Sequence, residues 1–207
     1  MAIENEYKYT SPQRVDKPEI IGMITSLLEQ KGFTFKTSER KHTDRYFDSP
    51  DMEITKQECF FRLRDYGDGR KKLTIKRPAG ENQNLLSREE IEKFTDGSAK
   101  KMIAFAEKYF PGIDISIIPV LTIESERSSI KYMDDGKKKI TIDQCTFVSG
   151  NDRLTFWELE LESLDEVPKD GFDTIGLEEL PKKTTFVPVY DSKYKRGLEW
   201  ISALSDA

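Results

Sequence analysis

The chain has 207 residues, a net charge of −5, and 34% charged against 36% hydrophobic residues, which fits one domain over residues 1–207. Its 12 Phe, 8 Tyr and 2 Trp exclude simple disorder, and its acidic balance argues against a nucleic-acid partner. The sequence shows neither an apolar N-terminal segment nor a run of about 18 apolar residues, so it predicts a cytoplasmic protein without a membrane partner.

Charged residues alternate with other residues near the start of the chain, in the segment IENEYKY at residues 3–9. A strand here would place Glu4, Glu6 and Lys8 on one face. A solvated face would explain the pattern, and so would a face that lines a charged site. The remaining strands decide between these two interpretations.

Three segments have the apolar spacing of amphipathic helices. They cover residues 19–31, residues 98–109 and the stretch from about residue 192 onward. A weaker helical pattern follows Leu164. Each helix has one apolar stripe, which must pack against another apolar surface.

The rest of the sequence is rich in strand patterns separated by tight-turn signals such as Asp68-Gly69. Consecutive strands joined by tight turns predict an antiparallel sheet, and a sheet with this many strands can curl or close. Further strands are predicted at residues 43–50, 58–65, 71–78, 87–94, 119–133, 137–148 and 154–163.

Every predicted strand has one apolar face and one charged face. The helices need the apolar face, so the charged face becomes the concave side of a curled sheet. Like charges follow one another at every second residue in RLR (62–64) and ELELE (158–162), which is unfavourable unless opposite charges or ligands lie nearby. We therefore predict a charged cavity, with an ordinary solvated sheet face as the alternative.

The cysteines and the single histidine show no metal-ligand or nucleophile spacing. We expect Cys59 and Cys145 to pack as small apolar groups. His42 is expected in a loop or at the edge of a strand.

Several segments resemble the CYTH family, the triphosphate tunnel metalloenzymes, which include thiamine triphosphatases, inorganic tripolyphosphatases and class IV adenylyl cyclases. ENEYK at residues 4–8 is similar to the family's ExExK signature. Together with this signature, seven further segments follow the family order and span nearly the whole chain: DRYFDSPD, FRLR, LTIKRP, SREEIE, TIDQC, ELELES and SKYKRGL.

This resemblance implies an α+β, mainly β fold, namely a closed or nearly closed antiparallel eight-stranded barrel with helices packed on its outside. The charged tunnel through the barrel would take a small-molecule triphosphate as its partner. The sequence leaves both a monomer and a homodimer open.

The resemblance also implies roles for the charged residues. Phosphate oxygens would be bound by Lys8, Arg62, Arg64, Lys76, Arg127 and Lys193. Mg²⁺ or Mn²⁺ would be bound by Glu4, Glu6, Glu160 and Glu162, with Glu158 as an alternative to Glu162. Glu4, Glu6, Lys8, Arg62 and Arg64 form the predicted catalytic group. Glu90, Glu92 and Asp143 would be further tunnel acids, and Glu90 could instead hold an arginine in place.

One position departs from the family pattern. Many members have a lysine two residues before the arginine that corresponds to Arg127, and this chain has Ser125 there. The departure removes one cation from the expected site. Lys131 has the same strand parity, although it lies far along the strand.

The expected activity is a divalent-metal-dependent triphosphatase that hydrolyses inorganic triphosphate or another compact organic triphosphate. The first alternative is a class IV adenylyl cyclase, which would form cyclic AMP and pyrophosphate from ATP and would need an adenine pocket. The second alternative is a non-catalytic polyphosphate- or nucleotide-binding module. The presence of all the expected metal-binding acids favours an enzyme.

Overall fold

The computed structural model describes residues 2–79, 86–133, 138–164 and 184–206. Its strands are β1 (Ala2–Ser11), β2 (Phe35–Phe47), β3 (Phe60–Asp65), β4 (Lys71–Pro78), β5 (Leu86–Thr95), β6 (Leu121–Tyr132), β7 (Lys138–Ser149), β8 (Asp152–Leu164) and the short β9 (Val187–Pro188). Its helices are α1 (Lys17–Gln30), α2 (Ala99–Tyr109) and α4 (Lys193–Ser205), with a 3-10 turn, η1, at Thr55–Gln57. The helical stretch predicted after Leu164 lies outside the described residues.

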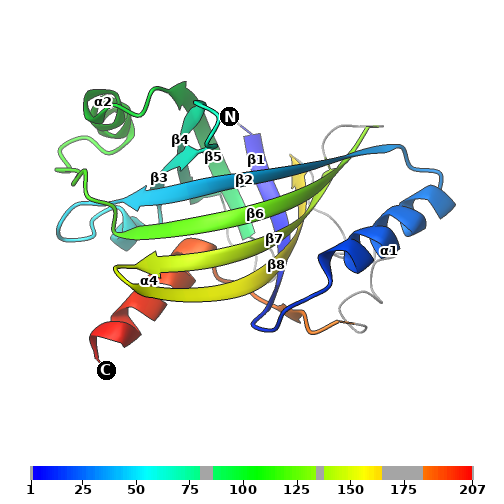
Figure 1. Ribbon diagram of the computed structural model, residues 1–207. Helices are drawn as coiled ribbons and strands as arrows, with labels where there is room; N and C mark the ends of the chain where they lie inside the picture. The colour runs from blue at the N-terminus through cyan, green and yellow to red at the C-terminus, as the bar shows by residue number, and fades with distance from the viewer. Residues whose placement is uncertain (1, 80–85, 134–137, 165–183, 207) are drawn as a thin grey trace.

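The strands form a closed antiparallel barrel (Figure 1). Eight of them follow the order β5-β4-β3-β2-β6-β7-β8-β1, and pairing between β1 and β5 closes the ring. The ninth strand, β9, only extends the pairing of β1. This architecture confirms the predicted fold class, and closure removes the unpaired edges that an open sheet would leave.

Helix α1 packs on the outside of β6, β7 and β8. The Asp16 side chain accepts a hydrogen bond from the Glu19 amide at 3.0 Å and so begins the helix, while Gly32, at φ +78°, follows its end. Ile24 and Leu28 are fully buried against Leu159 and neighbouring residues. Burial of each such side chain contributes about 1.5–3 kcal/mol.

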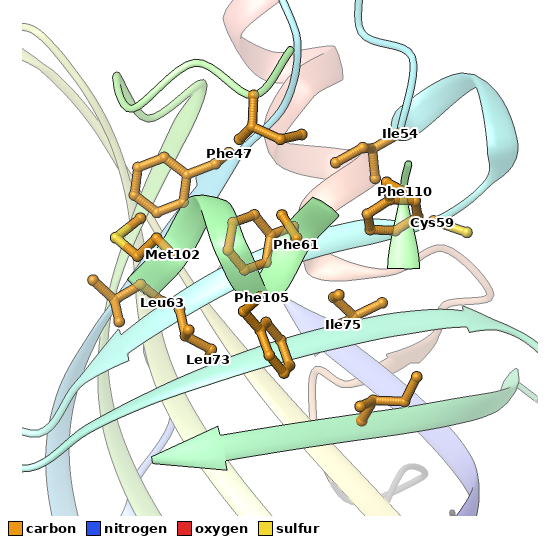
Figure 2. Close-up of a cluster of buried hydrophobic side chains, with 13 residues drawn as sticks. Phe47, Ile54, Cys59, Phe61, Leu63, Leu73, Ile75, Met102, Phe105 and Phe110 are labelled. Carbon is orange, nitrogen blue, oxygen red and sulfur yellow. The ribbon is translucent and has the colours of Figure 1, made fainter. Parts of the chain in front are cut away.

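Helix α2 covers the outer face of β3, β4 and β5 (Figure 2). Its Phe105 packs on Phe61 of β3, with ring centroids 6.2 Å apart. The same cluster includes Leu73 and Ile75 of β4. The apolar faces of the strands are therefore turned outward under helices, which leaves the charged faces inside.

The sequence predicted that all helices pack on the outside of the barrel. Helix α4 differs, because its first turn reaches into one end of the barrel. Its Tyr194 stacks on Tyr46, with ring centroids 4.8 Å apart, and packs beside Phe60, and all three side chains line the cavity inside the barrel. A Cβ on Gly197 would lie 2.4 Å from Leu121 Cδ2. The missing side chain therefore allows α4 to approach one end of the barrel closely.

The structure corrects the predicted position of His42. Strand β2 begins at Phe35, well before the predicted start at residue 43. The sequence did not predict this first half of the strand because it is almost wholly exposed and lacks an apolar alternation. His42 lies inside this strand and is only 5% exposed. Cys59 and Cys145 are free and buried, as predicted. None of the helices in the described ranges is long and apolar enough to cross a membrane.

Candidate active site

The inward faces of the strands enclose a cavity of about 420 Å³. It is highly charged, and among the described residues that line it nine are basic and seven acidic, so the lining as a whole favours an anion. The basic residues are Lys8, Arg62, Arg64, Lys72, Lys76, Arg88, Arg127, Lys139 and Lys193. The acidic residues are Glu4, Glu6, Asp44, Glu90, Glu92, Glu160 and Glu162.

Strands β1 and β8 place carboxylates side by side within the cavity. Their register sets Glu6 opposite Glu162 and Lys8 opposite Glu160. The Lys8 ammonium lies 2.7 Å from Glu6 and 3.5 Å from Glu160. Burial raises the pKa of Glu6, and the neighbouring Glu160 and Glu162 raise it further against the opposing effect of Lys8.

Strands β2 and β3 hold two arginines against one buried aspartate. Arg64 binds Asp44 in a two-pronged ion pair, with both N–O distances 2.7 Å. Arg62 donates to the same carboxylate and to Thr74 at 3.2 Å each. Burial alone would raise the pKa of Asp44, but Arg62 and Arg64 outweigh it and hold this pKa well below its usual value.

Strands β4 and β5 supply a second group of ion pairs. Lys76 pairs with Glu4 of β1 and lies 3.5 Å from Glu90 of β5. Glu90 also lies 3.9 Å from Arg62. Glu90 therefore contacts both an arginine and a lysine.

The third group joins β6, β7, β8 and the first turn of α4. Arg127 binds Asp143 through two hydrogen bonds, at 2.7 and 2.5 Å, and lies 3.1 Å from Glu160. Lys193 lies 2.8 Å from Asp143 and 3.1 Å from Glu160. Burial alone would lower the pKa of Lys193, but Asp143 and the glutamates of β8 raise it well above its usual value.

Glu158 shares the inward face of β8, yet it does not line the cavity. It is completely buried, pairs with Arg196 of α4, and lies 2.9 Å from Lys193. Because α4 already supplies two cations to this carboxylate, the structure favours Glu160 and Glu162 over Glu158 as cavity acids. Asp143 likewise lies behind Arg127 and Lys193 and does not line the cavity.

The remaining predicted residues all line the cavity. Strand parity found them because inward positions repeat every second residue. It missed Asp44, Tyr46 and His42 of β2, although Asp44 and Tyr46 belong to the quoted segment DRYFDSPD and share one parity. Parity did place Lys139 on the charged face of its strand, but the predicted site did not include this residue, which lines the cavity and pairs with Glu162 at 2.5 Å.

Ser125 lies on the cavity wall, so the position that departs from the family pattern is part of the site. Its hydroxyl lies 3.6 Å from the Cys145 sulfur on the neighbouring strand. Lys131 is exposed and is absent from the described cavity lining. The structure therefore gives no support to Lys131 as a replacement for the missing cation.

A divalent cation fits the donor set of β1 and β8. Mg²⁺ and Mn²⁺ bind carboxylate oxygens, and here Glu6, Glu160 and Glu162 crowd together closely enough that Glu160 and Glu162 raise the pKa of Glu6. In the described part of the chain no three carboxylate, imidazole or thiol groups already converge as a metal site. The four predicted ligands are engaged by cations: Glu4 by Lys76, Glu6 by Lys8, Glu160 by Lys193 and Glu162 by Lys139.

Comparison with protein families identifies the family of the chain. The sequence matches the CYTH domain over residues 2–184. The chain belongs to the CYTH family. Curated protein sequences include no significant match to it.

Solved structures share the fold of this CYTH protein. One is HpAC1 from Hippeastrum, described as an adenylyl cyclase candidate with a dominant triphosphatase activity; it is 16% identical, with a TM-score of 0.55 and 94% of each chain covered. Another is an adenylate cyclase candidate from Bacillus halodurans, 18% identical, with a TM-score of 0.52 and coverage of 95% of this chain and 98% of that one. At these identities the likeness establishes the barrel fold alone.

Proposed function

We propose that this CYTH protein is a divalent-metal-dependent triphosphatase that hydrolyses inorganic triphosphate or another compact organic triphosphate. The observation that carries the proposal is the cavity inside the barrel, which nine basic and seven acidic residues line in the described part of the chain. A linear polyanion complements the cations, and a hard divalent cation complements the carboxylates.

The arginines are prepared for phosphate binding. Arg64 uses Nε and Nη2 for Asp44, and Arg127 uses the same two nitrogens for Asp143 and Glu160. A guanidinium has five N–H donors in a fixed plane, so donors remain on each side chain. The carboxylate partners hold the guanidinium groups in place before substrate enters, which limits the ordering cost of binding.

The lysines would exchange partners on binding. Lys8 and Lys76 pair with Glu6 and Glu4 in the free protein. In the complex they would bind phosphate oxygens, and the released carboxylates would join Glu160 and Glu162 in holding the metal. When bound, the metal would neutralise phosphate charge and act as a Lewis acid at the phosphoryl group.

Catalysis would rest on positioning and charge neutralisation by the chain's own residues. Arg62, Arg64, Arg127 and Lys193 would orient the phosphate chain in the barrel. Burial strengthens each of these contacts because bulk water is largely kept away from them.

The test is a substrate panel of inorganic triphosphate, thiamine triphosphate and ATP, each with Mg²⁺, Mn²⁺ or EDTA. We expect phosphate release that requires the metal and is strongest with one triphosphate. Cyclic AMP from ATP would instead identify a cyclase. An absence of turnover, with triphosphate still raising the melting temperature, would identify a binding module.

A further inference from the structure

The imidazole of His42 is a buried polar group that the proposed chemistry leaves unused. It lines the cavity, and its side chain is 2% exposed. Its Nε2 lies 3.8 Å from Asp44 Oδ2, beyond hydrogen-bond distance. Its Nδ1 has no hydrogen-bond partner within the described part of the chain. A buried nitrogen without a partner is unfavourable, so this ring indicates a partner that enters from the cavity.

The surroundings of His42 explain why Nδ1 finds no partner among the described residues. Asp44 of β2 is taken by Arg64 of β3, and Asp143 of β7 is taken by Arg127 of β6. Ser125 lies directly opposite His42 in the register of β2 and β6. Its hydroxyl, however, interacts with Cys145 on the other side.

The charges around the ring keep it neutral in the free protein. Burial, together with the guanidinium groups of Arg64 and Arg127, lowers the pKa of His42 to about 2 against the opposing effect of Asp44 and Asp143. Tyr66, at the turn after β3, is the other titratable neighbour, with ring centroids 6.4 Å apart. A polyanion in the cavity would bring negative charge and acceptor oxygens next to the same ring.

We propose that His42 contacts the phosphate chain of the bound substrate and takes up a proton when that chain enters the cavity. It would thus provide, at the Ser125 position of the wall, a cation that exists only in the complex. The inference rests on the proposed function, because it assumes that the cavity binds a triphosphate. Binding at His42 should then strengthen as the pH falls, since protonation of the ring favours the complex.

His42 is the only histidine in the chain, so nuclear magnetic resonance of the imidazole nitrogens reports on this residue alone. The protein would be prepared without a histidine tag, labelled with ¹⁵N-histidine, and titrated with inorganic triphosphate in EDTA between about pH 6 and pH 8.5. We expect a neutral ring throughout in the free protein. In the complex both nitrogens should move toward the imidazolium pattern at the lower pH values.

Calorimetry on His42→Gln supplies the second readout. The ratio of its Kd for triphosphate to that of the wild type should be about tenfold near pH 6, as for one charge-assisted hydrogen bond, and should approach one near pH 8.5. The ratio cancels the protonation of triphosphate itself. The matched control is Lys41→Gln, one residue away, where the lost cation is exposed and pairs with Glu126.

The outcomes separate the two proposals. Unchanged nitrogen shifts at saturating triphosphate, or a Kd ratio near one at every pH, would overturn the role of His42 while leaving a measured triphosphatase activity intact. An absence of both binding and turnover in the wild type would overturn the proposed function and this inference together. If His42→Gln fails to fold, the wild-type spectra alone decide.

Discussion

Arg127 and Asp143 lie directly opposite each other on β6 and β7 and form a two-pronged ion pair inside the barrel. Asp143 is fully buried and also contacts Lys193 of α4. Burial alone would raise the pKa of Asp143, but Arg127 and Lys193 outweigh it and hold this pKa below its usual value. The carboxylate therefore stays ionised and holds in place two of the cations that are proposed to bind phosphate.

Asp143→Asn should therefore destabilise the fold and weaken substrate binding. Removal of one partner from a buried ion pair costs about 3–5 kcal/mol, and this should appear as a lower urea midpoint together with a raised KM. The control is Glu126→Gln on the neighbouring strand β6, whose exposed pair with Lys41 should contribute less than about 1 kcal/mol. Equal urea midpoints for the two variants would show that the buried ion pairs of Asp143 do not stabilise the fold.

Glu6→Gln and Glu4→Gln should each abolish turnover without unfolding the barrel. Both residues belong to the proposed metal-binding group, and we expect kcat/KM to fall more than about a hundredfold. Removal of a residue that only supports a metal ligand lowers activity by up to about a hundredfold, and loss of the ligand itself should cost more. Steady-state kinetics with Mg²⁺ measures this. Normal activity in either variant would rule out that residue as a metal ligand. Glu124→Gln, which removes an exposed carboxylate outside the cavity, is the control.

Arg62→Ala should lower kcat/KM for every triphosphate substrate. Arg62 is 7% exposed, and within the described residues its Nε has no hydrogen-bond partner. Loss of one or two charged hydrogen bonds at about 1.5–3 kcal/mol each predicts at least a tenfold decrease. Arg153→Ala removes an exposed arginine that pairs with Glu124 and should change nothing. An unaltered kcat/KM for Arg62→Ala would place this residue outside the site.

Gly197→Ala should destabilise the end of the barrel that α4 covers. The added methyl group would lie 2.4 Å from Leu121 Cδ2, and such overpacking costs about 1–3 kcal/mol. Gly22→Ala in α1 is the matched control, because a Cβ there meets nothing within 4 Å and should add about 0.4–1 kcal/mol of stability. Thermal unfolding of the two variants should shift in opposite directions. A shared direction would contradict the close contact of α4 with β6.

Acid should weaken the barrel partly through Glu90. Burial alone would raise its pKa, but Lys76 and Arg62 outweigh it and lower the pKa from 4.5 to about 2. A carboxylate with a depressed pKa stabilises the fold above pH 4.5, and this contribution, at most about 3 kcal/mol, is lost as the pH falls toward 2. Urea unfolding at pH 7, 4.5 and 3 should show a smaller acid loss for Glu90→Gln than for wild type. Identical pH profiles of the two proteins would show that the ion pairs of Glu90 add nothing to the free energy of unfolding.

The inward-facing residues could be predicted well because parity is a local property of a strand. Glu4, Glu6 and Lys8 were placed on one face from seven residues, and the structure sets all three in the cavity. The prediction was wrong for His42, because the exposed first half of β2 shows no alternation to extend the strand. The prediction overlooked Asp44. The role of its carboxylate depends on ion pairs with two arginines that lie eighteen and twenty residues away in the sequence.

By itself, the sequence determined that alternating strands would turn their charged faces toward one another and their apolar faces toward helices. Only the tertiary structure decided the depth of each residue along the barrel. Glu158, Glu160 and Glu162 share one face, yet Glu158 lies beneath Lys193 and Arg196 while the other two reach the cavity. The physical reason is that the face on which a side chain lies follows from local alternation along its strand. Its depth in the barrel follows from the register between strands and from the position of α4.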